Sequence, residues 1–208
     1  MGFLAERFMK YGLINNSDKA AIEMALREVD AEFPSQVISI LEIGIYAGET
    51  GNGMKEYLLS LDRDCFLTGI DNNADKEPIR FATAYNRLIG QDSGNAAYLI
   101  DDFSQHLIFI DGNHSYANVV ADFFCYAPKL RHDGFMIFHD TGIHIKPLTH
   151  YQKTGSEKDP HKYISVREAL FDIGLIQNEF KGWELVADVW DDKDEAGGVI
   201  VLKKKLKK

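Results

Sequence analysis

Cysteine, long apolar runs and positive charge are all scarce in this chain of 208 residues. Its two cysteines, Cys65 and Cys125, lie far apart within apolar segments, so we expect free thiols in a reducing cytosol and a cytoplasmic protein. No apolar run approaches the ~18 residues that a membrane span requires, and residues 1–7 lack the apolar core of a signal peptide, so no membrane association is expected. Lysine and arginine total 23 against 32 acidic residues. The net charge of −9 argues against nucleic-acid binding, because an acidic domain repels phosphate backbones.

The length and the apolar content suit one globular domain. A hydrophobic fraction of 45% is enough for a sizeable core. We divide this single domain, residues 1–208, into an N-terminal helical or lid segment (1–33), a core (37–141), a substrate-side loop (142–162) and a closing helix and hairpin (163–208). Ser17 is the expected N-cap of a helix that ends near Glu32. Whether the first segment covers the site or packs at the sheet edge stays open.

A glycine-bearing turn joins the first predicted strand to a helix. The β-branched run Val37–Leu41 predicts a buried strand, Glu42 follows it, and a helix-compatible stretch begins at Thr50. Between them lie Gly44 and Gly48, which allow positive φ and close approach of a ligand to the backbone. The G-x-G-x-x-G fingerprint of dinucleotide-binding proteins is absent. The turn alone fits either a ligand loop or an ordinary connection between strand and helix.

Polar groups follow the next two predicted strands. Cys65–Ile70 is expected to be a strand, and Asp71 at its end is placed to accept hydrogen bonds from ribose hydroxyls, although an Asp-Asn turn with Asn72 is an alternative. A helix is expected over 76–85 and a short strand over 87–90. The polar residues that follow this strand are Gln91, Asp92 and Ser93. They fit either a ligand loop or the N-cap of a following helix.

Two further apolar strands end in titratable side chains. Leu107–Ile110 leads into Asp111-Gly112-Asn113-His114, and Phe135–Phe138 leads into His139-Asp140. Because the carboxyl ends of neighbouring parallel strands lie at one rim of a sheet, we expect these groups to meet. A buried carboxylate is unfavourable unless it is paired or bound to a ligand, so packing alone does not explain the pattern.

These motifs resemble the class I S-adenosylmethionine-dependent methyltransferases. Over residues 37–141 they resemble the bacterial family of macrocin-type sugar O-methyltransferases and cephalosporin-hydroxylase-like proteins. The resemblance implies an α/β, Rossmann-like three-layer sandwich with a seven-stranded, mostly parallel sheet whose last strand is antiparallel. It implies that S-adenosylmethionine is the cofactor. The residues it assigns to that cofactor are Glu42, Gly44, Ile45, Tyr46, Gly48, Thr50, Asp71, Asn72, Gln91, Asp92, Ser93 and Asp111.

The resemblance also implies a divalent cation, Mg²⁺ or Mn²⁺, held by Asp111, His139 and Asp140. Carboxylate oxygens suit Mg²⁺, whereas the imidazole of His139 departs from the family pattern and favours Mn, Fe or Zn. Asn113 stands where the relatives have an aspartate base, and an amide cannot accept the proton. His114 and His139 are therefore the candidate catalytic bases.

We therefore predict a methyltransferase that acts on the hydroxyl of a small molecule or sugar, and leave homodimer formation open. One alternative is a non-catalytic S-adenosylmethionine-binding or interaction protein of the same fold, because Asn113 and His139 depart from the pattern. A nicotinamide-dependent oxidoreductase is less favoured, because its glycine triplet is missing.

Overall fold

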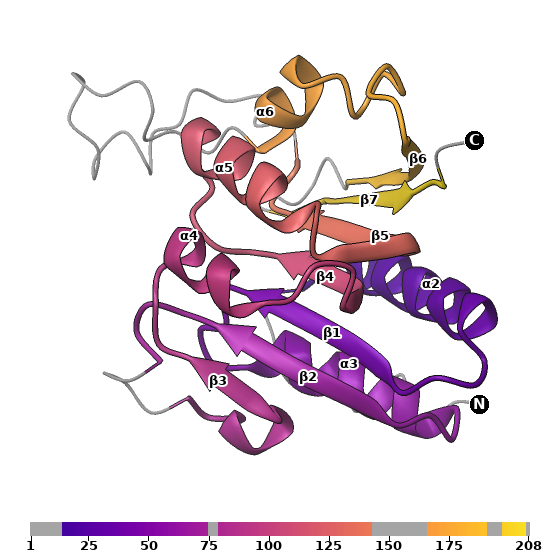
Figure 1. The fold of residues 1–208 in the computed structure, drawn as a ribbon, viewed down its shortest axis with the longest axis vertical. Coiled ribbons are helices and arrows are strands. Elements are labelled where there is room, and N and C mark those ends of the chain that lie inside the picture. The colour runs from indigo at the N-terminus through magenta and orange to yellow at the C-terminus, as the bar shows by residue number, and fades with distance from the viewer. Residues whose placement is uncertain (1–13, 75–78, 143–165, 191–196, 207–208) are drawn as a thin grey trace.

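A seven-stranded sheet forms the centre of the computed structural model, which describes residues 14–74, 79–142, 166–190 and 197–206. The strand order is β3-β2-β1-β4-β5-β7-β6, and β7 is antiparallel to both of its neighbours while the other pairs are parallel (Figure 1). The strands are β1 (Ile38–Ile43), β2 (Cys65–Ile70), β3 (Arg87–Ile89), β4 (Gln105–Ile110), β5 (Leu130–His139), β6 (Trp183–Val189) and β7 (Val199–Lys204). The predicted fold class is confirmed.

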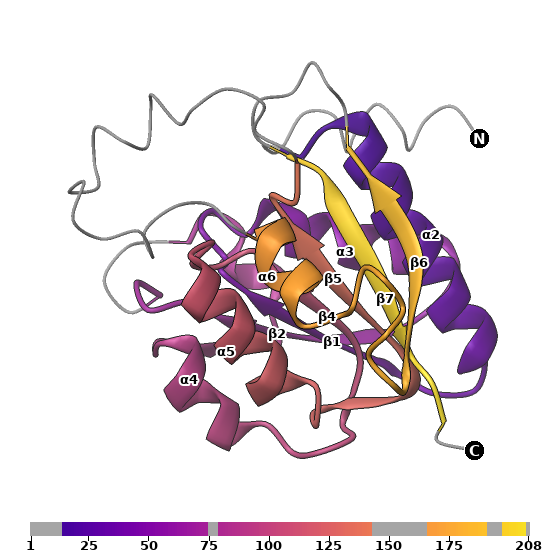
Figure 2. The same ribbon diagram turned by 90° about the horizontal axis from the view of Figure 1, so that it is seen from above.

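Helices cover both faces of the sheet and make three layers. Helices α2 (Asn16–Glu32) and α3 (Glu49–Ser60) lie on one face (Figure 2). The opposite face carries α4 (Ser93–Ala96), α5 (Tyr116–Tyr126) and α6 (Val166–Asp172), together with the short 3-10 helix η2 (Ala97–Leu99). A second 3-10 helix, η1 (Ala82–Ala84), precedes β3.

Each central strand is apolar on both sides, as expected for a parallel sheet between two helical layers. In β1, Ile38 and Ile40 pack on the α2 and α3 side, whereas Leu41 and Ile43 pack on the α5 side. The strands β4, β5 and β7 alternate in the same way. The sequence therefore specifies two cores, one on each face, and the strands are held with their carboxyl ends at a common rim.

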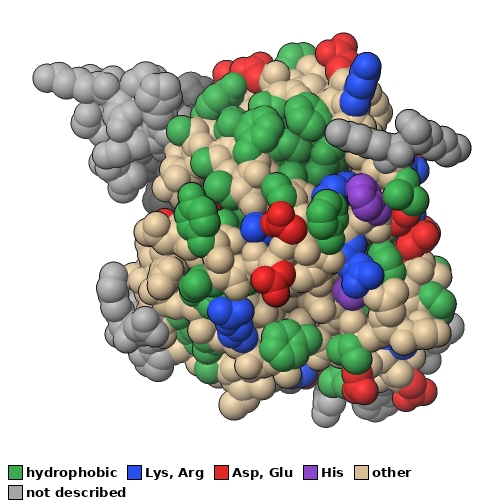
Figure 3. Space-filling model, in the orientation of Figure 1, with side chains coloured by type: hydrophobic (Ala, Val, Ile, Leu, Met, Phe, Trp, Pro, Cys, Tyr) green, Lys and Arg blue, Asp and Glu red, His purple; other side chains and the backbone are tan. Residues whose placement is uncertain are grey.

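Aromatic contacts attach α5 to the start of β6 and to the segment before it. The Phe123 ring lies 5.5 Å from that of Phe180 and 5.2 Å from that of Trp183. Hydrophobic side chains also gather on the surface in this part of the molecule (Figure 3), where Phe124 and Phe171 are exposed.

Cys65 and Cys125 are free, half-buried thiols.

Several predicted boundaries need correction. Asn15, not Ser17, caps α2, because the Asn15 side chain accepts a hydrogen bond from the Asp18 N–H. In the described part of the predicted helix 76–85, only the three residues of η1 are helical. Three segments lie outside the described residues: residues 1–13, for which a lid was one of two open alternatives, nearly all of the loop 142–162, and the acidic turn 191–196.

Candidate functional site

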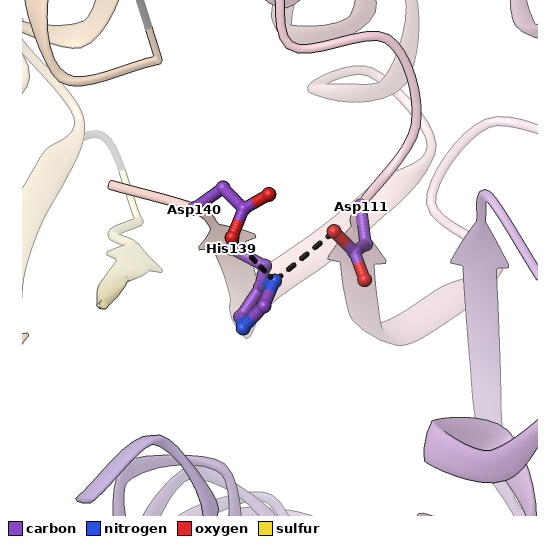
Figure 4. A group of neighbouring side chains, drawn as sticks. All are labelled: Asp111, His139 and Asp140. Atoms are coloured by element: carbon purple, nitrogen blue, oxygen red, sulfur yellow. Dashed lines mark hydrogen bonds and ion pairs between the residues drawn. The ribbon is translucent and has the colours of Figure 1, made fainter. Parts of the chain in front are cut away.

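Four titratable side chains meet where β4 and β5 end. Asp111 follows β4, His114 lies three residues further on, His139 is the last residue of β5, and Asp140 follows it. Successive side chains of a strand point to opposite faces. Here the backbone of Asp140 has φ +53°, so the chain turns out of the strand and brings its carboxylate beside His139 (Figure 4). Aspartate is among the few residues that tolerate this conformation.

The two histidines share the two carboxylates. His139 Nδ1 lies 3.1 Å from Asp111 Oδ1 and 3.4 Å from Asp140 Oδ1. His114 Nε2 lies 3.2 Å from Asp111 Oδ1, and its Nδ1 lies 3.1 Å from Asp140 Oδ2. We call Asp111, His114, His139 and Asp140 the rim cluster. The two candidate bases and the three candidate metal ligands are thus brought together.

A fifth group reaches the rim cluster from the N-terminal helix. Asp18, in the first turn of α2, is fully buried, and its Oδ2 lies 3.3 Å from His139 Nε2. The same oxygen accepts a hydrogen bond from the Gly198 N–H at 3.2 Å. The sequence analysis missed Asp18, because an acidic residue in the first turn of a helix is usually a solvated partner of the helix dipole.

The carboxylates determine the charge of the histidines. Burial acts to lower the pKa of His139, but the hydrogen bonds with Asp111 and Asp18 outweigh burial and raise its pKa to about 10. The pKa of His114 is raised as well, because Asp111 and Asp140 outweigh its burial. Burial likewise opposes ionisation of Asp111, yet the two imidazoles lower its pKa. These pKa shifts favour an ionised Asp111 beside two imidazolium groups when no metal ion is bound.

The donor atoms also fit a metal ion. One oxygen or nitrogen from each of Asp111, His139 and Asp140 can be chosen so that all lie within 4.8 Å of one another. Adjacent ligands of an octahedral ion at ~2.1 Å are ~3 Å apart, and the separations from His139 Nδ1 are close to that value. Two oxygens and one nitrogen suit Mn²⁺, Fe²⁺ or Zn²⁺ better than Mg²⁺.

Beside the cluster lies a cavity of about 420 Å³, a size typical of small-molecule sites. Eight of the predicted cofactor residues line it: Gly44, Tyr46, Asp71, Asn72, Gln91, Asp92, Ser93 and Asp111. No cofactor role was predicted for the other lining residues, which are Ile43, Ile70, Asn73, Ala74, Ile79, Gly112, Asn113 and Asn118. Most of these are immediate neighbours of predicted residues, whereas Asn118 projects from α5 and had no sequence signal of its own.

Four predicted cofactor residues are not among those lining the cavity. Glu42 is buried on the other side of β1, where its carboxylate accepts a hydrogen bond from the Tyr85 hydroxyl, and burial raises its pKa to about 8. Ile45 is a buried core residue. Gly48, with φ +80°, is the N-cap of α3, and Thr50 lies in the first turn of that helix.

Asp71 and Asp92 each fix a loop at the cavity. Asp71 Oδ2 accepts hydrogen bonds from the N–H groups of Ile45 (3.0 Å) and Tyr46 (3.1 Å), which ties the glycine turn to the end of β2. Asp92 caps α4 by accepting the Asn95 N–H at 3.0 Å. Asp71 Oδ1 also accepts the Asn73 N–H at 2.8 Å, so both turn roles that the sequence left open are present, and both residues still line the cavity.

The sheet order, the antiparallel β7 and a polar cavity at the strand ends define a Rossmann-like methyltransferase fold. Residues 41–141, just under half of the chain, match the family model described as a methyltransferase domain. This match and the fold both support the predicted enzyme class, a methyltransferase. A comparison with curated proteins found no match.

Solved structures share this fold at low sequence identity. A Corynebacterium glutamicum protein is 19% identical with a TM-score of 0.61, over 99% of this chain and 89% of its own. The O-methyltransferase TomG from Streptomyces achromogenes, in complex with S-adenosylmethionine, is 14% identical with a TM-score of 0.60, over 97% of this chain and 86% of its own. The methyltransferase MycE, in complex with Mg and S-adenosylhomocysteine, is 17% identical with a TM-score of 0.59, over 97% of this chain but only 53% of MycE.

Among the described helices, none has the length and apolar character needed to cross a membrane.

Proposed function

We propose that the protein transfers the methyl group of S-adenosylmethionine to a hydroxyl of a small molecule. The observation that carries the proposal is the position of Asp111, which lines the cavity and whose Oδ1 contacts both histidines. A cofactor in the cavity and an acceptor beside the rim cluster would then be neighbours. Two of the similar structures agree with this proposal: MycE also forms a complex with Mg, S-adenosylhomocysteine and mycinamycin VI, and TomG is an O-methyltransferase involved in tomaymycin synthesis.

In the proposed complex, different cavity residues contact different parts of the cofactor. The backbone of the turn from Gly44 to Tyr46 would contact the methionine part. Asp71 has carboxylate lone pairs beyond its three contacts with backbone N–H groups and would accept the ribose hydroxyls. Gln91, Asp92 and Ser93 would contact the adenine. A bound divalent cation, held by Asp111, His139 and Asp140, would polarise the acceptor hydroxyl.

His114 is the proposed catalytic base. Its side chain is 24% exposed, whereas that of His139 is 6% exposed and enclosed by three carboxylates. In the displacement, the acceptor oxygen forms a bond to the methyl carbon, the carbon–sulfur bond breaks, and its electron pair neutralises the sulfonium. His114 takes the hydroxyl proton. The charges of Asp111 and Asp140 raise its pKa. A divalent cation bound by those carboxylates would offset their charge. The pKa of the His114 imidazole would then return to a range suited to proton transfer near pH 7.

Calorimetric titration tests the cofactor assignment. We expect micromolar binding of S-adenosylmethionine, no binding of NAD, and loss of binding in Asp71→Ala. Asp101→Ala is a matched control, because Asp101 is an exposed aspartate away from the cavity. With an acceptor in hand, His114→Gln should lower kcat about 100-fold or more without changing cofactor affinity. If the folded protein bound no S-adenosylmethionine, the enzyme assignment would be withdrawn in favour of a non-catalytic protein of this fold.

A further inference from the structure

Asp18 makes an unusual contact for a helix residue. Its carboxylate has no exposed surface, although burying an ionised carboxylate is costly unless a partner compensates for it. The partners of its Oδ2 are His139 Nε2 and the Gly198 N–H, and its Oδ1 has no hydrogen-bond partner among the residues that the structure describes. These partners lie 121 and 180 positions away along the chain. Helix capping does not explain a carboxylate that points into the sheet.

The two nitrogens of His139 face different groups. Nδ1 points to Asp111 and Asp140, and Nε2 points to Asp18. If Nδ1 binds a cation, it must give up its proton, and the remaining N–H is then on Nε2. A histidine that binds a metal through one nitrogen commonly donates the other N–H to a carboxylate, which fixes the ring orientation and makes the ligand more basic.

We propose that Asp18 is a positioning residue of the metal site, which accepts the Nε2–H of His139 and thereby directs Nδ1 at a divalent cation. The inference rests on the cation part of the proposed function. A neutral imidazole brings no charge to a site whose other ligands are Asp111 and Asp140, and Asp18 adds a third negative charge on the far side of that imidazole. With two oxygens and one nitrogen, the occupant would be a cation of the Mn²⁺ or Zn²⁺ type.

Mn²⁺ titration followed by electron paramagnetic resonance, without cofactor or acceptor, tests this proposal. Asp18→Ala should weaken Mn²⁺ binding about 10- to 100-fold. Asp18→Asn should weaken it less, because the amide oxygen still accepts the Nε2–H while the charge is lost. Asp30→Ala is the matched control: Asp30 is on the same helix but pairs with Arg63 at 3.0 Å, and this variant should bind Mn²⁺ like the wild type.

A second readout follows the hydrogen bond itself. In the Zn²⁺-loaded protein, the His139 Nε2–H should give a slowly exchanging, downfield proton resonance that Asp18→Ala loses and Asp18→Asn keeps. Binding of S-adenosylhomocysteine to each variant reports whether the fold is intact. Should Asp18→Ala fail to fold, Asp18→Asn carries the test alone, because it retains the buried shape.

The possible outcomes distinguish failure of the proposed role of Asp18 from failure of the proposed function. Equal Mn²⁺ affinity in the wild type, Asp18→Asn and Asp18→Ala would overturn the role of Asp18 and leave the metal site standing. Absence of Mn²⁺ and Zn²⁺ binding in the wild type would overturn the inference together with the cation part of the proposed function. The titration with S-adenosylmethionine reports the rest of that function independently.

Discussion

His106 and His139 are both buried histidines of neighbouring strands, with 2% and 5% exposure, yet their surroundings move their pKa values in opposite directions. The carboxylate partners of His139 raise its pKa to about 10. The pKa of His106 is lowered to about 4, because burial disfavours the imidazolium and Arg131 repels it. Its Nδ1 accepts the Ser39 N–H at 2.9 Å, and its Nε2 lies 3.2 Å from Gln36 Oε1. His106 is therefore a neutral structural residue, whereas His139 belongs to the rim cluster.

The neutral state of His106 predicts acid sensitivity of the fold. Protonation of Nδ1 would remove its bond with Ser39. Because the pKa of His106 is lower in the folded state (about 4) than in the unfolded state (ordinary value 6.5), the unfolded chain binds the extra proton. Its stabilising contribution is present above about pH 6.5 and declines as the pH falls to about 4. The expected loss in the free energy of unfolding over this pH range is about 3 kcal/mol at most.

Urea unfolding at pH values from 7 to 4 measures this effect. His106→Gln should be less stable at pH 7 and should show a weaker decline than the wild type over that range. His132→Gln is the control, since His132 stacks on Phe103 at the same end of the sheet. A decline in His106→Gln as steep as that of the wild type would contradict the assignment.

At the scale of elements, the connection between β1 and α3 requires a glycine at position 44. Gly44 has φ +84°, and a Cβ built on it would lie 2.1 Å from the carbonyl oxygen of Asp111. Gly44→Ala should therefore lower the free energy of unfolding by about 3 kcal/mol or more, because backbone strain adds to a clash with another backbone. Denaturant unfolding measures the loss.

Gly112→Ala is the matched control for this turn. A Cβ at Gly112 would meet its nearest atom at 3.5 Å, an ordinary contact, and the stability should change by less than about 1 kcal/mol. Equal stability of the two variants would mean that the turn adapts and that Gly44 is not required for the close approach of β1 and β4.

The elements themselves were largely predictable, because uninterrupted apolar runs such as Leu107–Ile110 indicate strands that are buried on both faces. The direction of Glu42 was also predictable, although the sequence analysis did not use it. Period-two alternation places Glu42 with Ile38 and Ile40, whereas the cavity lies on the side of Ile43. The placement of the metal residues was not predictable in full. The positive φ of Asp140 has no sequence signal, and the contact between Asp18 and His139 exists only in the folded chain.

At the scale of the whole molecule, the site lies where the strand order reverses. The chain runs outward from β1 to β2 and β3, and then returns to β4 on the other side of β1. Ligands of open α/β sheets bind at such a switch point, outside the carboxyl ends of the strands. Most cavity residues come from the ends of β1, β2, β3 and β4, so a bound ligand would contact both halves of the sheet.

A ligand that joins these halves in the folded state, and does not bind the unfolded chain, should stabilise the entire domain. At a concentration of about 100 times its Kd, S-adenosylhomocysteine should add about 2.7 kcal/mol to the free energy of unfolding. For a domain of this size, that energy corresponds to a rise in Tm of about 5–10 °C. Scanning calorimetry measures the shift. NAD at the same concentration should leave Tm unchanged, and Asp71→Ala should respond to neither compound. A shift with NAD but none with S-adenosylhomocysteine would show that the cavity serves a different cofactor, even though the fold is that of a methyltransferase.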